Sequence, residues 1–156
     1  MCGIAGIINN NEENPSQSDV ENVSNALRHR GPDAQGIVHD KNTCFIHRRL
    51  SIIDTTETGA QPMYDRKKRY IITYNGEIYN YKEIKKKLLE KGVQFRGESD
   101  TEVLLEAYIL WGIQSLEMLE GMFAFSIWDR EKEELLIARD AMGEKPLFYT
   151  HKADGS

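Results

Sequence analysis

The second residue of the chain is a cysteine, and its position gives it a nucleophile's chemistry. The chain begins Met1-Cys2-Gly3-Ile4, and the enzyme that removes an initiating methionine prefers a small second residue. Removal of Met1 would leave Cys2 with its thiol and a free α-amine, whose ordinary pKa of about 7.7–8 keeps part of it neutral near pH 7. Cys2 would then carry a nucleophile and its general base without any histidine. The alternative is a small apolar residue that packs at the start of a strand.

A second group of residues could bind a free α-amino acid, which needs a cation for its carboxylate and an acid for its ammonium group. Arg49 suits a bidentate carboxylate contact, and Glu77 and Asp100 are acids at the ends of predicted elements. Asn75 offers a side-chain N–H and Gly76 an unobstructed backbone N–H, so the two could hold an oxyanion. The alternatives are a surface ion pair for Arg49, a helix N-cap for Asp100 and a turn at Asn75-Gly76.

The composition restricts the class of protein. The 156 residues are enough for one domain, residues 1–156, that needs no disulfides. The two cysteines, Cys2 and Cys44, fit a reducing compartment, so we expect a cytoplasmic protein. A net charge of −5 argues against nucleic-acid binding. There is no signal peptide, apolar membrane-spanning run, zinc-type spacing or phosphate loop, so we expect no membrane contact, no metal and no cofactor in this domain.

The order of predicted elements indicates an α+β fold with mainly antiparallel pairing, because strands and helices do not alternate regularly. A helix capped by Ser18-Asp19 ends before Gly31-Pro32. A β-prone run, Arg69–Tyr74, ends at the Asn75-Gly76 turn signal. The remaining predicted strands are Gly3–Asn9, Gln35–His39, Thr43–His47, Met122–Asp129, Glu134–Arg139 and Pro146–Thr150. The remaining predicted helices are Tyr81–Lys91, a helix that opens at Gly97–Asp100 and is ended by Gly112, and a short helical piece at Leu116–Leu119.

Several motifs occur together along the chain. They are Met1–Ile4, Arg28–Asp33, His47–Asp54, Gly59–Met63, Tyr74–Asn80, Ser99–Glu102, Gly121–Phe125 and Arg139–Asp140 with Gly143 and Pro146–Leu147. In type and order they closely resemble the glutaminase domain of glutamine-hydrolysing asparagine synthetases, a class II glutamine amidotransferase domain. The resemblance covers nearly the whole chain, and the His47–Ile52 stretch favours the asparagine-synthetase branch of that class.

The resemblance implies a fold and a set of roles. The fold would be a four-layer αββα N-terminal-nucleophile (Ntn) hydrolase sandwich of two mainly antiparallel sheets. The implied roles are Cys2 as nucleophile with its α-amine as base, Asn75 and Gly76 as oxyanion hole, Arg49 as carboxylate ligand, and Glu77 and Asp100 as ammonium ligands, with backbone groups around Ile52 assisting. The implied reaction is hydrolysis of L-glutamine to glutamate and ammonia through a thioester on Cys2.

The resemblance also implies a larger protein. In the family, further strands of this domain and then an ATP-dependent synthetase domain follow, so we expect 1–156 to be an incomplete domain. ATP, Mg²⁺ and aspartate would belong to the synthetase domain, and a homodimer is an option. The alternatives are the same glutaminase serving another acceptor, such as a surface sugar, or a non-catalytic interaction domain. The retained set of site residues argues against the last alternative.

Overall fold

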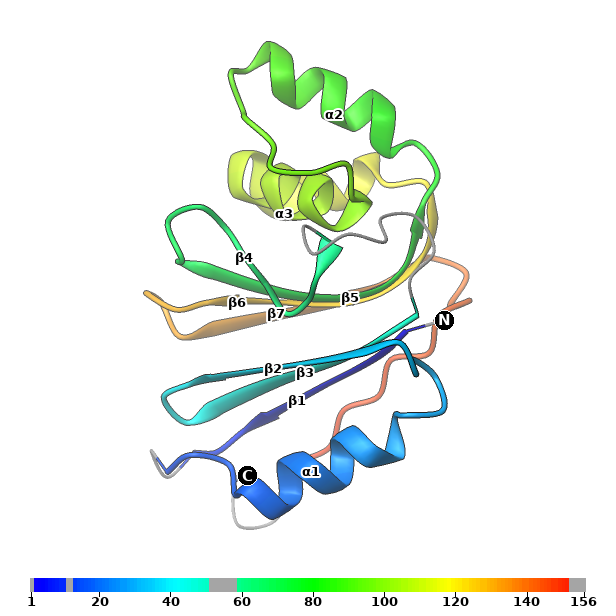
Figure 1. Cartoon of the computed structure of the whole chain (residues 1–156). Helices are drawn as coiled ribbons and strands as arrows, with labels where there is room; N and C mark the ends of the chain where they lie inside the picture. The colour runs from blue at the N-terminus through cyan, green and yellow to red at the C-terminus, as the bar shows by residue number, and fades with distance from the viewer. Residues whose placement is uncertain (1, 11–12, 51–58, 152–156) are drawn as a thin grey trace.

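The protein is a sandwich of four layers in the order helix, sheet, sheet, helix (Figure 1). The computed structural model describes residues 2–10, 13–50 and 59–151. Sheet A is three-stranded, in the order β1-β3-β2, and sheet B is four-stranded, in the order β4-β5-β6-β7. All pairs are antiparallel. The α+β, αββα fold expected from the sequence is therefore confirmed.

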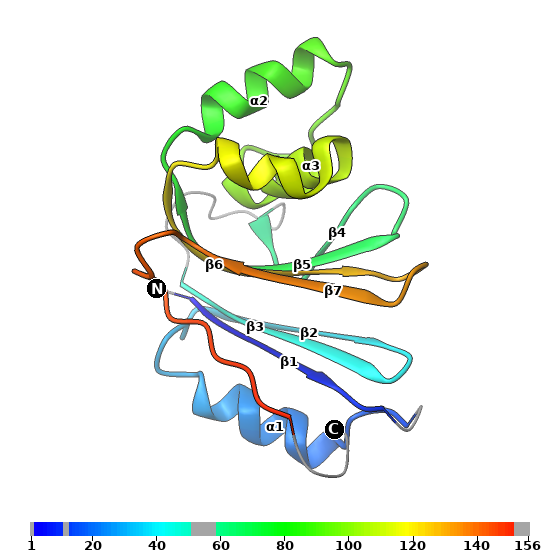
Figure 2. The same cartoon turned by 180° about the vertical axis from the view of Figure 1, so that it is seen from behind.

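The strands and helices have the following bounds. Sheet A contains β1 (Gly3–Ile8), β2 (Ala34–Asp40) and β3 (Thr43–Arg49). Sheet B contains β4 (Met63–Tyr64), β5 (Tyr70–Ile78), β6 (Gly121–Asp129) and β7 (Glu134–Arg139). The helices are α1 (Gln17–Ala26), α2 (Tyr81–Glu90) and α3 (Asp100–Trp111), followed by a 3-10 helix at Gly112–Met118. Figure 2 shows α1 against sheet A and α3 against sheet B, with α2 packed on the far side of α3.

Three details of the predicted elements are wrong. The N-cap of α1 is Ser16, whose Oγ accepts a hydrogen bond from the Asp19 backbone N–H, so Ser18-Asp19 lies in the first turn. The Asn75-Gly76 pair is not a turn, because β5 continues through it in register with β6. The segment Pro146–Thr150 has no regular structure and pairs with no strand of the described chain. Its β-propensity is not enough to form a strand without a pairing partner.

Each interface between layers has its own apolar core. The largest lies between sheet B and the α2–α3 layer and includes Ile72, Tyr74, Leu88, Leu104 and Phe125. A second lies between α1 and sheet A and is built on Val20, Cys44 and Ile46. The third joins the two sheets through Phe45, Ile71 and Trp128. No helix in the described part of the chain is long and apolar enough to cross a bilayer.

A buried carboxylate also joins the two sheets. Asp40, at the end of β2, accepts hydrogen bonds from Trp128 Nε1 at 2.9 Å and from Arg130 Nε and Nη2 at 2.9 and 2.7 Å. Burial alone would raise the pKa of this carboxyl, but the hydrogen bonds from Arg130 and Trp128 hold it below its usual range. This connection stabilises the end of the sandwich where the β2–β3 and β6–β7 turns lie (Figure 1).

We expect Asp40→Asn to lower the free energy of unfolding by about 2 kcal/mol at pH 7, because it weakens charge-assisted hydrogen bonds to a buried group. Urea denaturation measures the change. Glu133→Gln is the matched control, because it removes an exposed ion pair with Lys41 that contributes little. Equal losses in the two variants would contradict the role given to Asp40.

Candidate active site

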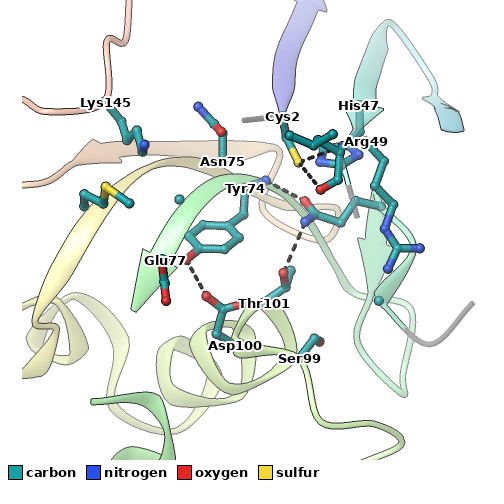
Figure 3. Close-up of a pocket in the computed structure, with 15 residues that line it drawn as sticks. Cys2, His47, Arg49, Tyr74, Asn75, Glu77, Ser99, Asp100, Thr101 and Lys145 are labelled. Atoms are coloured by element: carbon teal, nitrogen blue, oxygen red, sulfur yellow. Dashed lines mark hydrogen bonds between the residues drawn. The ribbon is translucent and has the colours of Figure 1, made fainter. Parts of the chain in front are cut away.

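One pocket gathers the residues predicted from the sequence. It is lined by Cys2, His47, Arg49, Leu50, Gly59, Gln61, Tyr74, Asn75, Gly76, Glu77, Ser99, Asp100, Thr101, Met122 and Lys145. They come from the residue before β1, the end of β3, the segment before β4, β5, the start of α3, β6 and the segment after β7; Figure 3 labels ten of them. Six of the seven predicted site residues therefore lie together. The seventh, Ile52, lies outside the described residues.

The Cys2 thiol lies against the end of β3. The Leu50 backbone N–H donates to Cys2 Sγ at 3.4 Å, and the thiol lies 3.6 Å from the Leu50 carbonyl oxygen, to which it donates. Cys2 precedes β1, and Gly3 opens the pairing of β1 with β3 opposite Arg48. The strand pairing therefore fixes where the Cys2 thiol lies.

A polar loop after α1 holds both Cys2 and the end of β3. Arg30 Nε donates to the Cys2 carbonyl oxygen at 3.2 Å, and the Asp33 backbone N–H donates to the Arg49 carbonyl oxygen at 3.0 Å. A Cβ on Gly31 would lie 2.2 Å from the Arg48 carbonyl oxygen, so only glycine allows this approach. The loop positions the backbones of Cys2 and Arg49 relative to each other.

Arg49 is the last residue of β3 and is half-buried at the edge of the pocket. Strand alternation directs neighbouring side chains to opposite faces. Arg48 accordingly reaches the other way, and its Nε donates to the Ser24 carbonyl oxygen and Oγ, both at 3.0 Å. Of the two adjacent arginines, Arg48 anchors α1 and Arg49 alone lines the pocket.

Asn75 and Gly76 lie within β5, opposite Ala124 and Phe123 of β6. Asn75 is buried and lies between Cys2 and Lys145 in Figure 3. A Cβ on Gly76 would lie 2.3 Å from the Met122 carbonyl oxygen, so the position requires glycine. The two residues present an amide side chain and a backbone with no side chain beside it, which is what an oxyanion site needs.

The two predicted acids differ in environment. Asp100 is buried, and its Oδ2 accepts hydrogen bonds from the Tyr74 hydroxyl at 2.6 Å and from the Ile78 backbone N–H at 3.2 Å. Burial raises the pKa of Asp100, and these hydrogen bonds oppose that rise. Glu77 lines the same pocket and is exposed. The alternative role of Asp100 as an N-cap is not realised, because Ser99 caps α3.

His47 is a pocket residue that the sequence did not single out as chemical. It lies on β3 and is 1% exposed. In the described structure its Nε2 is buried without a hydrogen-bond partner. Burial lowers the pKa of His47 to about 4, with a smaller contribution from the positive charge of Arg49, while a hydrogen bond with the Tyr74 backbone opposes the change. His47 is therefore neutral near pH 7, and a second charge beside Arg49 is avoided.

Gln61 and Lys145 were also missed as site residues, although both fall within or beside the recognised motifs. Gln61 joins β5 to α3 through hydrogen bonds described below. Lys145 is 4% exposed, and its backbone N–H donates to the Asp140 carboxylate at 3.0 Å. Asp140 also accepts from the Phe123 backbone N–H at 3.2 Å, which ties this segment to β6. The burial of Lys145, in the irregular segment after β7, is the feature that marks it, and burial cannot be read from one sequence.

No group of three or more metal-ligating side chains occurs within residues 2–10, 13–50 and 59–151. Cys2 and Cys44 are both free thiols. The pocket holds a thiol, an arginine, two carboxylates and an amide, whose charges complement the carboxylate and ammonium groups of an amino acid.

The sequence matches the family model described as a glutamine amidotransferase domain over residues 1–156. The chain therefore belongs to the glutamine amidotransferase domain family, and it is an enzyme domain with the Ntn-hydrolase fold. Among curated proteins, it is 43% identical over 153 residues to asparagine synthetase [glutamine-hydrolyzing] 1 of Bacillus subtilis (strain 168). That alignment covers 96% of this chain and 24% of the relative.

A plant asparagine synthetase matches the chain at the same identity. Asparagine synthetase [glutamine-hydrolyzing] 2 of Arabidopsis thaliana is 43% identical over 160 residues, which cover 100% of this chain and 27% of the relative. The chain thus spans about a quarter of the length of these relatives. Among solved structures, the glutamine phosphoribosylpyrophosphate amidotransferase of B. subtilis matches with a TM-score of 0.69 at 24% identity, over 88% of this chain and 37% of that one. That match supports the fold alone.

The buried neutral His47 predicts a pH-dependent stability. Between pH 6.5 and about 4 the unfolded chain binds a proton at this histidine that the folded chain does not, so stability falls as the pH falls through this window. We expect His47 to account for a loss of about 2 kcal/mol between pH 7 and pH 5. Urea denaturation at both pH values measures it.

The variant His47→Gln should lose this part of the pH dependence, while His29→Gln, at an exposed histidine, should keep it. An unchanged pH dependence in His47→Gln would contradict the lowered pKa of His47, because a histidine with the same pKa in the folded and unfolded chain contributes no pH dependence.

Proposed function

We propose that this domain hydrolyses L-glutamine to L-glutamate and ammonia through a γ-glutamyl thioester on Cys2. The observation that carries the proposal is the convergence of a thiol, a carboxylate-binding cation, an ammonium-binding acid and an oxyanion site on one pocket. Membership of the glutamine amidotransferase domain family supports it. Removal of Met1 supplies the base, because the α-amine of Cys2 is then free.

The pocket fits the zwitterionic end of glutamine. The guanidinium of Arg49 binds the α-carboxylate, since its fork geometry matches the two oxygens. The carboxylates of Asp100 and Glu77 bind the α-ammonium, with Asp100 held in place and Glu77 at the surface. Charges at one end of the substrate thereby place its side-chain amide beside Cys2.

The reaction then proceeds in two halves. The Cys2 sulfur attacks the amide carbon, its proton passes to the α-amine, and the negative charge develops on the amide oxygen. Asn75 Nδ2 and the Gly76 backbone N–H donate to that oxygen. The α-amine returns the proton to the amide nitrogen as the C–N bond breaks, and ammonia leaves. Water, deprotonated by the same amine, hydrolyses the thioester to glutamate and frees the thiol.

In the full protein we propose that the ammonia is consumed in ATP-dependent synthesis of asparagine from aspartate. The support is that the curated relatives are glutamine-hydrolysing asparagine synthetases about four times as long as this chain. A C-terminal synthetase domain would be the partner, with ATP and Mg²⁺ as its ligands, in a cytoplasmic enzyme that forms homodimers. The runner-up is another ammonia acceptor, and assaying the full protein with aspartate distinguishes the two.

We expect the chain without Met1 to release glutamate from L-glutamine, and Cys2→Ala to abolish the release. Asn75→Ala should lower kcat about 100- to 1000-fold with little change in KM, because the oxyanion forms only in the transition state. An enzyme-coupled glutamate assay measures both parameters. Equal losses in binding and turnover for Asn75→Ala would contradict its assignment to the oxyanion hole.

The two adjacent arginines give a matched test of carboxylate binding. Arg49→Ala should raise KM for L-glutamine at least about 10-fold, because it removes a charge-assisted contact. Arg48→Ala should leave KM within about 2-fold and lower the thermal midpoint, because Arg48 anchors α1. The same KM in both variants would reject Arg49 as the carboxylate ligand.

A further inference from the structure

We propose that Tyr74 is a positioning residue that orients the Asp100 carboxylate toward the ammonium group of the substrate. The inference rests on the proposed function and deepens it, because it assigns to Tyr74 a part in the recognition of the substrate's α-ammonium group. Tyr74 lies on β5, directly before the oxyanion residues, and Asp100 is the first residue of α3. The two residues belong to different layers, so their contact ties the subsite together across a layer boundary.

The contact between them is short and buried. The Tyr74 hydroxyl donates to Asp100 Oδ2 at 2.6 Å, and the Ile78 backbone N–H donates to the same oxygen at 3.2 Å. Tyr74 is 3% exposed and Asp100 is 5% exposed. Two donors from β5 on one oxygen fix the rotation of the carboxylate relative to that strand, and we infer that Oδ1 makes the ammonium contact. Figure 3 shows the Tyr74 ring directed at Asp100.

A second connection holds the same two elements together. Gln61 Oε1 accepts from the Tyr74 backbone N–H at 2.7 Å, and Gln61 Nε2 donates to Thr101 Oγ1 at 3.1 Å. Thr101 follows Asp100 in the first turn of α3. Gln61 thus holds the backbone of Tyr74, and the hydroxyl of Tyr74 holds Asp100. A shift of either Tyr74 or Asp100 alone would break one of these hydrogen bonds.

The hydroxyl also affects when Asp100 is charged. Burial raises the pKa of Asp100, and the hydrogen bond from Tyr74 opposes that rise, because it favours the carboxylate. Burial and the charge of Asp100 raise the pKa of Tyr74 well above 10, so its hydroxyl remains a donor throughout the useful pH range. The titratable groups that line the pocket with Asp100 are Cys2, His47, Arg49, Tyr74, Glu77 and Lys145.

The test compares two ligands that differ only in the ammonium group: L-glutamine and glutaramate, which is glutamine without its α-amine. Their dissociation constants are measured by calorimetry in Cys2→Ala, where no turnover occurs, with and without Tyr74→Phe. We expect Tyr74→Phe to lower the preference for L-glutamine over glutaramate about 10-fold. Partial unfolding weakens the binding of both ligands equally, so the ratio of the two dissociation constants reports the orientation of Asp100 rather than the overall stability.

The pH dependence is a second readout. Without the Tyr74 hydroxyl, the pKa of Asp100 rises further, so the loss of L-glutamine binding on acidification begins at a higher pH. Glutaramate binding lacks this contact and should show no such movement between the two variants. If Tyr74 only packed against its neighbours, Tyr74→Phe would leave the pH dependence of binding unchanged for both L-glutamine and glutaramate.

Tyr70→Phe is the matched control, since Tyr70 is also on β5 but packs edge-on against Tyr108, away from the pocket. It should leave the ligand preference unchanged. Should Tyr74→Phe not fold, Gln61→Met tests the same coupling and should lower the preference in the same direction. An unchanged preference in the folded variant overturns the inference, whereas a Cys2→Ala parent with no preference for L-glutamine overturns the proposed function itself.

Discussion

The uninterrupted pairing of β5 with β6 through Gly76 is the constraint on which the site depends. An Asn-Gly pair, which elsewhere often forms a tight turn, here continues β5 in register with β6. Position 76 must be glycine, because the Met122 carbonyl oxygen lies where the Cβ of any other residue would be. The pairing holds the backbone around Asn75 in register with β6. In the proposed reaction, the strand hydrogen bonds would therefore preorganise the Asn75 and Gly76 donors for a developing negative charge, and preorganisation is the usual source of such stabilisation.

Around this strand, the pocket is assembled from the ends of elements in different layers. Sheet A supplies the thiol and the arginine, sheet B the amide, and the helical layer the buried acid. Each end is held by a contact from another element: Arg30 holds the backbone of Cys2, and Gln61 links β5 to α3. The opposite end of the sandwich is closed by Asp40, so both ends of the sheets are cross-connected.

Sequence patterns predicted the two hairpins and the helices well, because alternation and periodicity are local properties. The resemblance to a known class placed Cys2, Arg49, Asn75, Gly76 and Asp100, which the structure brings into one pocket. Local signals failed where tertiary packing decides: the turn expected at Asn75-Gly76 is a paired strand. Contacts such as Tyr74 with Asp100 join residues 26 positions apart, and no periodicity reports which side chains meet across layers.

The hydrogen bonds between the Cys2 thiol and the Leu50 backbone have a consequence for substrate size. Leu50 directly follows Arg49, the last residue of β3, so the backbone at the end of this strand places both the sulfur and the proposed carboxylate ligand. In the proposed function, the distance between the two would select the length of the amino acid that spans it. Asparagine is one methylene shorter than glutamine, and a misplacement of about 1 Å can cost about 100-fold in rate. An enzyme whose proposed product is asparagine would in this way be prevented from hydrolysing it.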